Sequence, residues 1–440
     1  MTPSVVDLEP FARRRARAQR LLGKNSLLIL PAAPSVVVGR DIDLRYLPDS
    51  DLYYLSGYTE PGAVLVLGPA KEEESFTLFV RPRDPEQERW SGVRGGPEAA
   101  REIYGADAAY PLAELEDRLA QRIARAEILY YPLGSGSDEL EALIRRAVSN
   151  ARLKRQRTGR GLRALLDPGT LLDELRLFKD DHELGLLAEA SRITVDAFRD
   201  AAPRIRPGAG EWEVEAALEE GFRRRGADGV AFATIVGSGP NATILHYIDN
   251  SRVMHAGELL LIDAGARYRH YNGDISRTFP VSGRFTPAQR DLYDVVLAAH
   301  DNAIAAVEPG ITYAEVHHIA VRTMVQGLVD LGIMTGEVDE IIAEQSYKRY
   351  YPHQTGHWLG LDVHDVGDYS LDGEPRPLMP GMVLTVEPGL YIPADDERVP
   401  EELRGAGIRI EDDVVVTDTG HEVLTAGLPT AAAEVEALLS

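Results

Sequence analysis

The chain has 440 residues, enough for two domains of ordinary size. Hydrophobic residues make up 44% and charged residues 27%, as in globular proteins with a sizeable core, and a formal net charge of -23 argues against nucleic acid or an anionic membrane as a partner. Because there is no cysteine, disulfides, thiolate catalysis and thiolate-bound zinc are excluded, and any metal must be held mainly by carboxylates and imidazoles.

The first 25 residues show no targeting pattern. They contain a basic run, Arg13 to Arg17, but no apolar signal-peptide core follows it. No apolar run elsewhere approaches the length of a membrane span. We therefore expect a cytoplasmic location.

Short apolar strands alternate with helical patterns from Ser26 to about Ala151, which indicates a small mixed α/β domain. The predicted strands are Leu27–Leu30, Ala63–Leu67 and Phe76–Val80, and a predicted helix spans Pro111–Ala124. From Asn150 to Asp167 the composition shifts to arginine, lysine and glycine, which we interpret as a linker or an exposed edge. We place the domain boundary near residue 170, with an N-terminal domain of residues 1–170 and a second domain of residues 171–440.

The second domain is predicted to be α+β with two related halves. Asp181–Ala201 carries the apolar stripe of an amphipathic helix, and further helices are expected at about Pro287–Val307 and Tyr313–Leu331. Strand and turn patterns begin after Phe232.

Two stretches of the second domain repeat each other. Gly257–Gly265 and Gly381–Gly389 are both apolar strands that end in an acid, then alanine or proline, then glycine. Upstream of each, Pro-Gly is followed at the same spacing by Glu-Val, in Pro207–Val214 and in Pro309–Val316. A motif of this kind is typical of the start of a helix. The sequence therefore predicts two copies of one helix-then-strands unit, related by a pseudo-two-fold axis.

Each half contributes two carboxylates from one strand pair: Asp263 and Asp274 in the first, Glu387 and Glu411 in the second. A carboxylate at the end of an apolar strand is costly to desolvate unless a positive charge meets it. A pseudo-two-fold axis would bring the four together, and two divalent metal ions would neutralise them where one ion would balance only half the charge. A single acid in such a place is more often a turn or capping residue, so only the pairing across the repeat favours ligands.

Four histidines lie in settings that suit this chemistry. His357 follows a glycine and begins an apolar stretch, which favours a neutral imidazole that binds metal. One imidazole with four carboxylates favours Mn²⁺ over a structural zinc. His246 and His364 are candidates for orienting substrate or handling protons, whereas a lone histidine beside apolar residues is more often a satisfied core residue. The fourth is His353.

The chain resembles the pita-bread metallopeptidases, a family that includes methionine aminopeptidases, Xaa-Pro dipeptidases (prolidases) and aminopeptidase P. The likeness rests on the ligand order Asp, Asp, His, Glu, Glu, filled here by Asp263, Asp274, His357, Glu387 and Glu411. The segments that most resemble aminopeptidase P are Asp51–Pro61, Arg83–Gly96, His353–Gly360 and Gly407–Asp413. The likeness thus covers essentially the whole chain, and it implies a pita-bread catalytic domain after the smaller α/β domain.

The resemblance implies a role for each ligand. Asp274 and Glu411 would bridge two divalent metals, Asp263 would hold one of them, and His357 with Glu387 would hold the other. A water between the metals would have a lowered pKa and become a hydroxide nucleophile.

The resemblance also implies residues that act on the substrate. Glu387 would accept the nucleophile's proton, and His246 or His364 would stabilise the tetrahedral intermediate. Around the metals, Arg409 would orient a carboxylate, and His353 is a further candidate for contact with substrate or ligands.

The implied activity is hydrolysis of the bond between an N-terminal residue and a following proline, in peptide substrates, by a homo-oligomer. Trp90 would cap the substrate pocket, with a neighbouring subunit as its source, or would serve only in ordinary packing. A prolidase is the nearest alternative, but many prolidases carry a longer insertion between the two segments that hold Glu387 and Glu411. A peptide-binding protein of the same fold without catalysis is the second alternative.

Overall fold

The computed structural model describes residues 7–440. The chain divides into two compact units, Met1–Arg176 and Leu177–Ser440, and the division falls within helix α7 (Gly169–Leu177). The first six residues, which the sequence assigns to the N-terminal domain, lie outside the described part. Within residues 7–440 no helix combines the length and the apolar character that crossing a membrane requires.

The first unit is built on a six-stranded mixed sheet of order β6-β5-β4-β1-β7-β8. The strands of this sheet are β1 (Ser26–Pro31), β4 (Val64–Leu67), β5 (Phe76–Val80), β6 (Ala108–Pro111), β7 (Ile128–Tyr130) and β8 (Ala164–Leu166). Strands β2 (Val37–Val38) and β3 (Ile42–Asp43) form a separate two-stranded sheet. The other helices of the unit are α1 (Glu9–Leu21), α2 (Ser50–Ser56), α3 (Pro85–Ser91), α4 (Gly96–Glu102), α5 (Leu115–Ile123) and α6 (Asp138–Thr158). The central strand β1 pairs antiparallel with β4 and parallel with β7. The three predicted strands and the mixed α/β character are confirmed.

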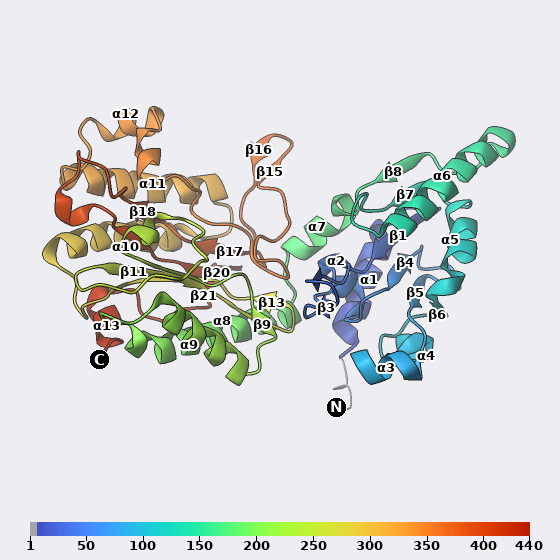
Figure 1. Ribbon diagram of the computed structural model, residues 1–440. Helices are drawn as coiled ribbons and strands as arrows, with labels where there is room; N and C mark the ends of the chain where they lie inside the picture. Colours follow the sequence, from blue (N-terminus) through green and yellow to red (C-terminus); the bar gives the residue numbers. More distant parts are fainter. Residues whose placement is uncertain (1–6) are drawn as a thin grey trace. The chain divides into compact units, whose positions relative to one another are not determined.

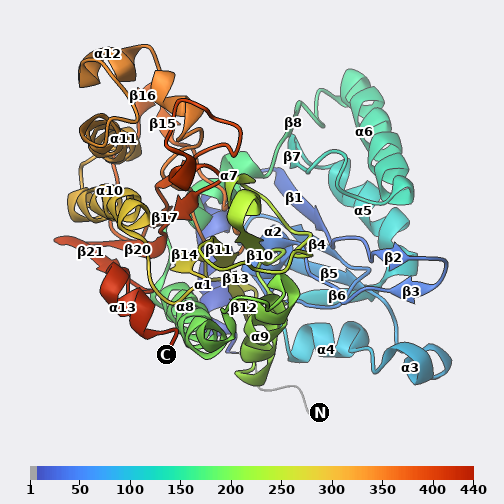
Figure 2. The same cartoon turned by 60° about the vertical axis from the view of Figure 1, so that its left-hand side comes forward.

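Of the two interpretations of Asn150 to Asp167, the linker is wrong where a helix continues to Thr158, and the exposed edge is confirmed for residues 152–160, which are all exposed. Helix α6 continues through it to Thr158 and ends at Gly159, whose φ of 69° is left-handed. Apolar residues at helical spacing, among them Leu143, Ala147 and Ala151, pack against the sheet, while the arginines and lysines point outward. Figure 2 shows α5 and α6 together on one side of this sheet.

The second unit contains the two predicted halves. Its helices are α8 (Asp181–Ala201), α9 (Glu211–Arg224), α10 (Pro287–Ala306), α11 (Tyr313–Asp330), α12 (Val338–Ala343) and α13 (Ala432–Ala437). The strands of its first half are β9 (Gly229–Val230), β10 (Ile235–Ser238), β11 (Leu259–Ala264), β12 (Ala266–Tyr268), β13 (Tyr271–Asn272) and β14 (Ile275–Pro280). Those of its second half are β15 (Ser370–Leu371), β16 (Glu374–Pro375), β17 (Val383–Val386), β18 (Gly389–Tyr391), β19 (Gly407–Arg409), β20 (Asp412–Thr417) and β21 (Gly420–Val423).

The two Pro-Gly motifs of the repeat lie just before corresponding helices, α9 and α11. Gly208 and Gly310 have φ values of 87° and 100°, a conformation that glycine adopts without strain. The glutamate that follows accepts a hydrogen bond from the N–H three residues before it, Gly210 to Glu213 at 3.0 Å and Thr312 to Glu315 at 2.8 Å. The glutamates of the repeat are therefore helix caps, and its glycines are turn residues.

The two halves meet through their strands. In the first, β11 pairs antiparallel with β14, and in the second β17 pairs antiparallel with β20. Helices α8 and α9 pack on the first strand pair, and α10 and α11 pack near the second. Figure 1 shows α10 and α11 above the strands and α8 and α9 below them. The predicted α+β class with a pseudo-two-fold repeat is confirmed.

Candidate active site

A cavity of about 620 Å³ opens in the second unit, where the carboxylates of the two strand pairs come together. Its ionisable lining residues are His246, Asp263, Asp274, His353, His357, His364, Glu387, Arg409 and Glu411. These are all the sequence-predicted site residues except one. Trp90 lies on α3 in the first unit, where 87% of its surface is exposed.

The carboxylates occupy corresponding places at the strand ends. Asp263 lies on β11 and Glu387 directly follows β17, while Asp274 and Glu411 each directly precede the returning strand. The N–H of Glu411 donates to the carbonyl of Ser276 at 3.1 Å, which ties the returning strand of one half to that of the other. The repeat therefore places one pair of acids from each half around one space.

The imidazole of His357 faces two of these acids. Its Nδ1 lies 3.0 Å from the carbonyl oxygen of Trp358, so Nδ1 carries the proton and Nε2 presents a lone pair. Nε2 lies 3.5 Å from Asp274 Oδ2 and 3.8 Å from Glu387 Oε1. One ligand atom each from Asp274, His357 and Glu411 lie within 4.8 Å of one another, close enough to share a metal ion.

The electrostatics of the acids call for a cation. Burial, and then the charges of Glu411 and Asp263, raise the pKa of Asp274 well above its usual range. Burial followed by Glu411 does the same to the pKa of Glu387, and burial followed by Asp263 raises the pKa of Glu411 to about 7. Asp263 Oδ1 is buried and has no hydrogen-bond partner among residues 7–440. Clustered carboxylates with an unpartnered oxygen and one imidazole lone pair form a donor set that fits divalent cations.

Arg409 is the one guanidinium that lines the cavity among the described residues, and it is 3% exposed. Its Nη2 donates to Asp263 Oδ2 at 2.7 Å, its Nη1 to Tyr391 Oη at 2.8 Å and its Nε to Ser276 Oγ at 2.8 Å. Ser276 in turn donates to Glu411 Oε2 at 2.8 Å. Arg409 and Ser276 thus hold one carboxylate from each half.

His353 belongs to the same network. Its Nε2 lies 2.9 Å from Tyr391 Oη and its Nδ1 lies 2.7 Å from the carbonyl oxygen of Gln354. Because Tyr391 accepts from Arg409, its hydroxyl proton is available for His353 Nε2, and Nδ1 carries the ring proton. Burial, with the charge of Arg409, lowers the pKa of His353 to about 3, so this ring is neutral near neutral pH.

His246 and His364 form an exposed part of the rim. The His364 ring lies edge-on to His357 with the centroids 4.3 Å apart. Burial, and then the neighbouring His357, lower the pKa of His364, which favours a neutral ring that can donate or accept a proton.

Sequence reasoning missed the apolar wall of the cavity and the supporting residues Tyr391 and Ser276. The apolar lining residues are Phe232, Ala233, Ile235, Leu245, Ile248 and Val363. Tyr391 stands just after the repeat that ends at Gly389, so its closeness to a predicted ligand was the available signal.

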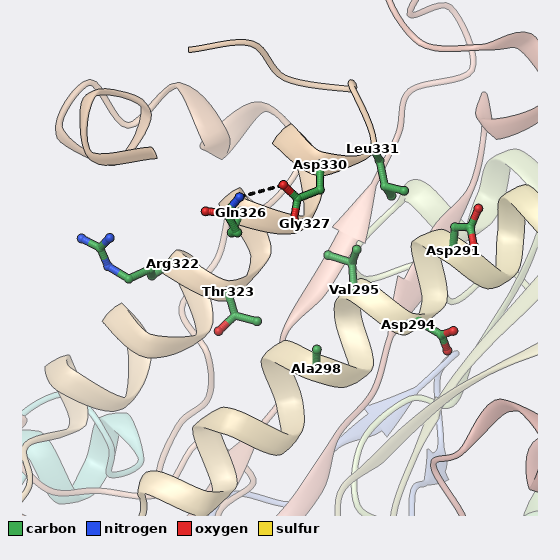
Figure 3. Close-up of a pocket in the computed structure, with 10 residues that line it drawn as sticks. All are labelled: Asp291, Asp294, Val295, Ala298, Arg322, Thr323, Gln326, Gly327, Asp330 and Leu331. Carbon is green, nitrogen blue, oxygen red and sulfur yellow. Dashed lines mark hydrogen bonds between the residues drawn. The ribbon is translucent and has the colours of Figure 1, made fainter. Parts of the chain in front are cut away.

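A second hollow of about 600 Å³ lies over α10 and α11 (Figure 3). Its polar groups pair locally: Gln326 donates to Asp330 at 2.8 Å, and Asp294 pairs with Arg290 at 2.9 Å. This surface gathers no set of ligands comparable to that of the cavity, within the residues that the structure describes.

Comparison with known proteins decides the family. A family model described as metallopeptidase family M24 matches residues 185–418, more than half of the chain. The chain belongs to metallopeptidase family M24. A second model, the aminopeptidase P N-terminal domain, matches residues 11–130. The family assignment confirms a metal-dependent peptidase, and a divalent metal agrees with the donor set of the cavity.

Similarity to individual relatives extends over nearly the full length of the chain. The chain is 43% identical to the Xaa-Pro aminopeptidase of Escherichia coli, over 99% of this chain and 98% of the relative. It matches the structure of Pseudomonas aeruginosa aminopeptidase PepP with a TM-score of 0.95 at 43% identity, covering 99% and 98% of the two chains. It matches Zn-substituted Escherichia coli aminopeptidase P in complex with product with a TM-score of 0.94 at 42% identity, covering 99% of each chain. The predicted pita-bread fold and its N-terminal domain are confirmed.

Proposed function

We propose that this metallopeptidase is an Xaa-Pro aminopeptidase, which removes the first residue of a peptide whose second residue is proline. The observation that carries the proposal is the complete set of three carboxylates and one imidazole around Asp274, in a chain similar over its whole length to enzymes named for this activity. Peptides with proline at the second position are the proposed partners.

The proposed ligand set is the one that the repeat and the resemblance predict. Asp263, Asp274, His357, Glu387 and Glu411 would hold two divalent ions in the cavity that all five residues line. The unpartnered Oδ1 of Asp263 and the free lone pair of His357 Nε2 support these assignments. When bound, the ions supply Lewis acidity and lower the pKa of water so that it becomes nucleophilic at neutral pH. Oxygen-rich ligation favours Mn²⁺ as the native metal.

Glu387 is the proposed proton carrier. Its raised pKa, caused by burial and by Glu411, allows it to accept a proton from the attacking water and to return it to the leaving proline nitrogen. His246 and His364 on the rim would donate hydrogen bonds to the carbonyl oxygen of the scissile bond as negative charge develops there.

A peptide substrate with proline at its second position requires a dedicated binding site. An Xaa-Pro bond has no amide hydrogen, so an enzyme cannot hold this backbone through that group. The cavity offers apolar side chains such as Leu245 and Val363 beside the polar groups His353 and Arg409, which suits an apolar pyrrolidine ring next to a polar backbone. Trp90, which is exposed on the first unit, is proposed to cap a substrate pocket from a neighbouring subunit. We also propose that the protein is cytoplasmic and forms a homo-oligomer.

The test compares two substrates with metal-loaded protein: an Xaa-Pro-Yaa tripeptide and an Xaa-Pro dipeptide, each with and without EDTA. The proposal expects cleavage of the tripeptide that EDTA abolishes, with little cleavage of the dipeptide. A preference for the dipeptide would assign prolidase activity instead. Tight binding of the tripeptide without cleavage would favour a peptide-binding role.

A further inference from the structure

Each exposed histidine of the cavity rim is followed in the chain by a buried residue. That buried residue forms a hydrogen bond or an ion pair with a second buried side chain. Tyr247 follows His246 and donates to Glu211 Oε2 at 2.9 Å. Asp365 follows His364 and pairs with Lys179 at 2.9 Å. Both histidines are exposed, yet the residue next to each is no more than 8% exposed.

Glu211 accepts hydrogen bonds from several residues of the segment 238–252, which carries His246. Its side chain is fully buried at the start of α9 and accepts hydrogen bonds from both ends of the segment. The donors are Ser238 N at 2.7 Å, Ser238 Oγ at 2.7 Å, Asn241 Nδ2 at 3.3 Å, Tyr247 Oη at 2.9 Å and Arg252 N at 2.9 Å. A buried carboxylate is tolerated when several donors meet it, and these donors all belong to residues 238–252.

The segment between those donors also supplies part of the cavity wall. Leu245, His246 and Ile248 line the cavity, and all three follow the end of β10 at Ser238. Tyr247 packs among Ile235 and Leu261 on the inner side. The side chains therefore alternate, with Tyr247 anchored inward and His246 turned to the cavity.

The second pair anchors the segment that carries His364. Lys179 Nζ and Asp365 Oδ2 lie 2.9 Å apart, with side chains only 1% and 2% exposed. Asn272 holds the same segment by donating from Nδ2 to the carbonyl oxygens of Gly360 at 3.1 Å and Leu361 at 2.9 Å. A buried ion pair of this kind costs desolvation and contributes mainly by fixing geometry.

We propose that Glu211 with Tyr247, and Lys179 with Asp365, are positioning pairs that fix His246 and His364 at the substrate. This inference rests on the proposed function, because it gives the two histidines a role in turnover. Neither pair touches the reacting atoms. Each acts through the histidine beside it, so its loss lowers kcat only while that histidine is present.

The experiment is a double-mutant cycle on metal-loaded protein with an Xaa-Pro-Yaa tripeptide. Tyr247→Phe removes one hydroxyl and is measured in the wild-type and His246→Ala backgrounds. We expect about a tenfold loss of kcat in the wild-type background and no further loss in the His246→Ala background. An equal loss in both backgrounds would overturn the inference, as would no loss in the wild type.

Tyr293→Phe is the matched control. Tyr293 is also a buried tyrosine, and its hydroxyl donates to the carbonyl of Thr430 at 2.7 Å, away from the cavity lining. We expect its kcat to equal that of the wild type. A loss as large as that of Tyr247→Phe would mean that any buried tyrosine hydroxyl matters, and would overturn the specific role of Tyr247.

The second pair has its own cycle. Lys179→Met with Asp365→Asn removes both charges together, so that no buried charge is left unpaired. We expect a loss of kcat that vanishes in the His364→Ala background, and a persistent loss would overturn this half of the inference.

A readout without turnover separates this inference from the proposed function. The imidazole NMR signal of His246 is expected to shift or broaden in Tyr247→Phe and to stay unchanged in Tyr293→Phe. An unchanged signal in Tyr247→Phe would overturn the inference even if the enzyme is active. Failure of the metal-loaded wild type to cleave any Xaa-Pro peptide would overturn the proposed function and the catalytic part of the inference, whatever the NMR signal shows.

Discussion

Arg409 Nη2 donates a 2.7 Å hydrogen bond to Asp263 Oδ2, and this contact links β19 in one half of the second unit to β11 in the other. It fixes one oxygen of the carboxylate, while Oδ1 stays buried without a hydrogen-bond partner among residues 7–440. We propose that the guanidinium orients Asp263 so that its second oxygen can bind a cation.

Arg409→Lys is expected to weaken metal binding roughly 10–100-fold, because an ammonium cannot reproduce the fixed fork that reaches Asp263, Tyr391 and Ser276 together. Isothermal titration with Mn²⁺ measures the change. Arg398→Lys is the control, since Arg398 is 54% exposed and pairs with Asp396 outside the cavity lining. Equal Mn²⁺ affinity in Arg409→Lys and wild type would contradict the orienting role.

Asp274→Asn is expected to abolish turnover and yet to stabilise the metal-free protein. Burial, Glu411 and Asp263 raise the pKa of Asp274, so ionising it near neutral pH costs folding free energy that a neutral amide avoids. The melting temperature of metal-free protein should rise by about 2–4 °C for each kcal/mol relieved. Calorimetry in EDTA checks this, and a lower melting temperature than wild type would refute it.

Asp412→Asn is expected to lower the stability of the metal-free protein, the opposite of the effect expected for Asp274→Asn. Asp412 pairs with Arg277 at 2.8 Å and with His300 at 3.0 Å. Burial alone would raise its pKa, but Arg277 and His300 outweigh it and lower the pKa to about 2. Neutralising Asp412 leaves the buried Arg277 without its counter-charge, so we expect a loss of about 3–5 kcal/mol in urea unfolding of the metal-free protein. Stabilisation by this change would contradict the assigned ion pair.

His317 is expected to contribute to the loss of stability in acid. Its ring on α11 lies 2.7 Å from Thr355 Oγ1, and burial, with Lys348 and His318 nearby, lowers its pKa to about 4. Between about pH 4 and pH 6.5 the unfolded chain binds a proton at this position that the folded chain does not, so stability falls as pH falls through that window.

The measurement is the drop in melting temperature between about pH 7 and pH 5. His317→Gln should show a smaller drop than wild type. His318→Gln, on the same helix at an exposed position, is the control and should show the wild-type drop. If His317→Gln were as acid-sensitive as His318→Gln, the burial of His317 would not govern this effect.

The ligand-bearing strands could be predicted because they repeat. Gly257–Gly265 and Gly381–Gly389 carry the same pattern. A pattern that occurs twice predicts that Asp263 and Glu387 occupy corresponding places, even when the contacts of neither residue are known. The helix starts were predictable for a local reason, since a turn glycine and a capping glutamate act within a few residues of each other.

The supporting network could not be predicted in the same way. Tyr391, Ser276 and Glu211 contact residues far along the chain, and no local periodicity reports such pairs. The linker expected after Asn150 failed because basic composition was read without the apolar stripe of Ala147 and Ala151 that continues α6. Composition describes the exposed face of that helix, and burial decides its fold.

The most direct test of the central claim is to count bound metal and measure cleavage on the same samples. Wild-type protein, stripped with EDTA and reloaded with Mn²⁺, is analysed by inductively coupled plasma mass spectrometry and assayed with an Xaa-Pro-Yaa tripeptide. The account predicts that cleavage returns as occupancy reaches two ions per chain, and that Asp274→Asn regains neither full occupancy nor cleavage. Undiminished cleavage by stripped protein, or by Asp274→Asn, would contradict it.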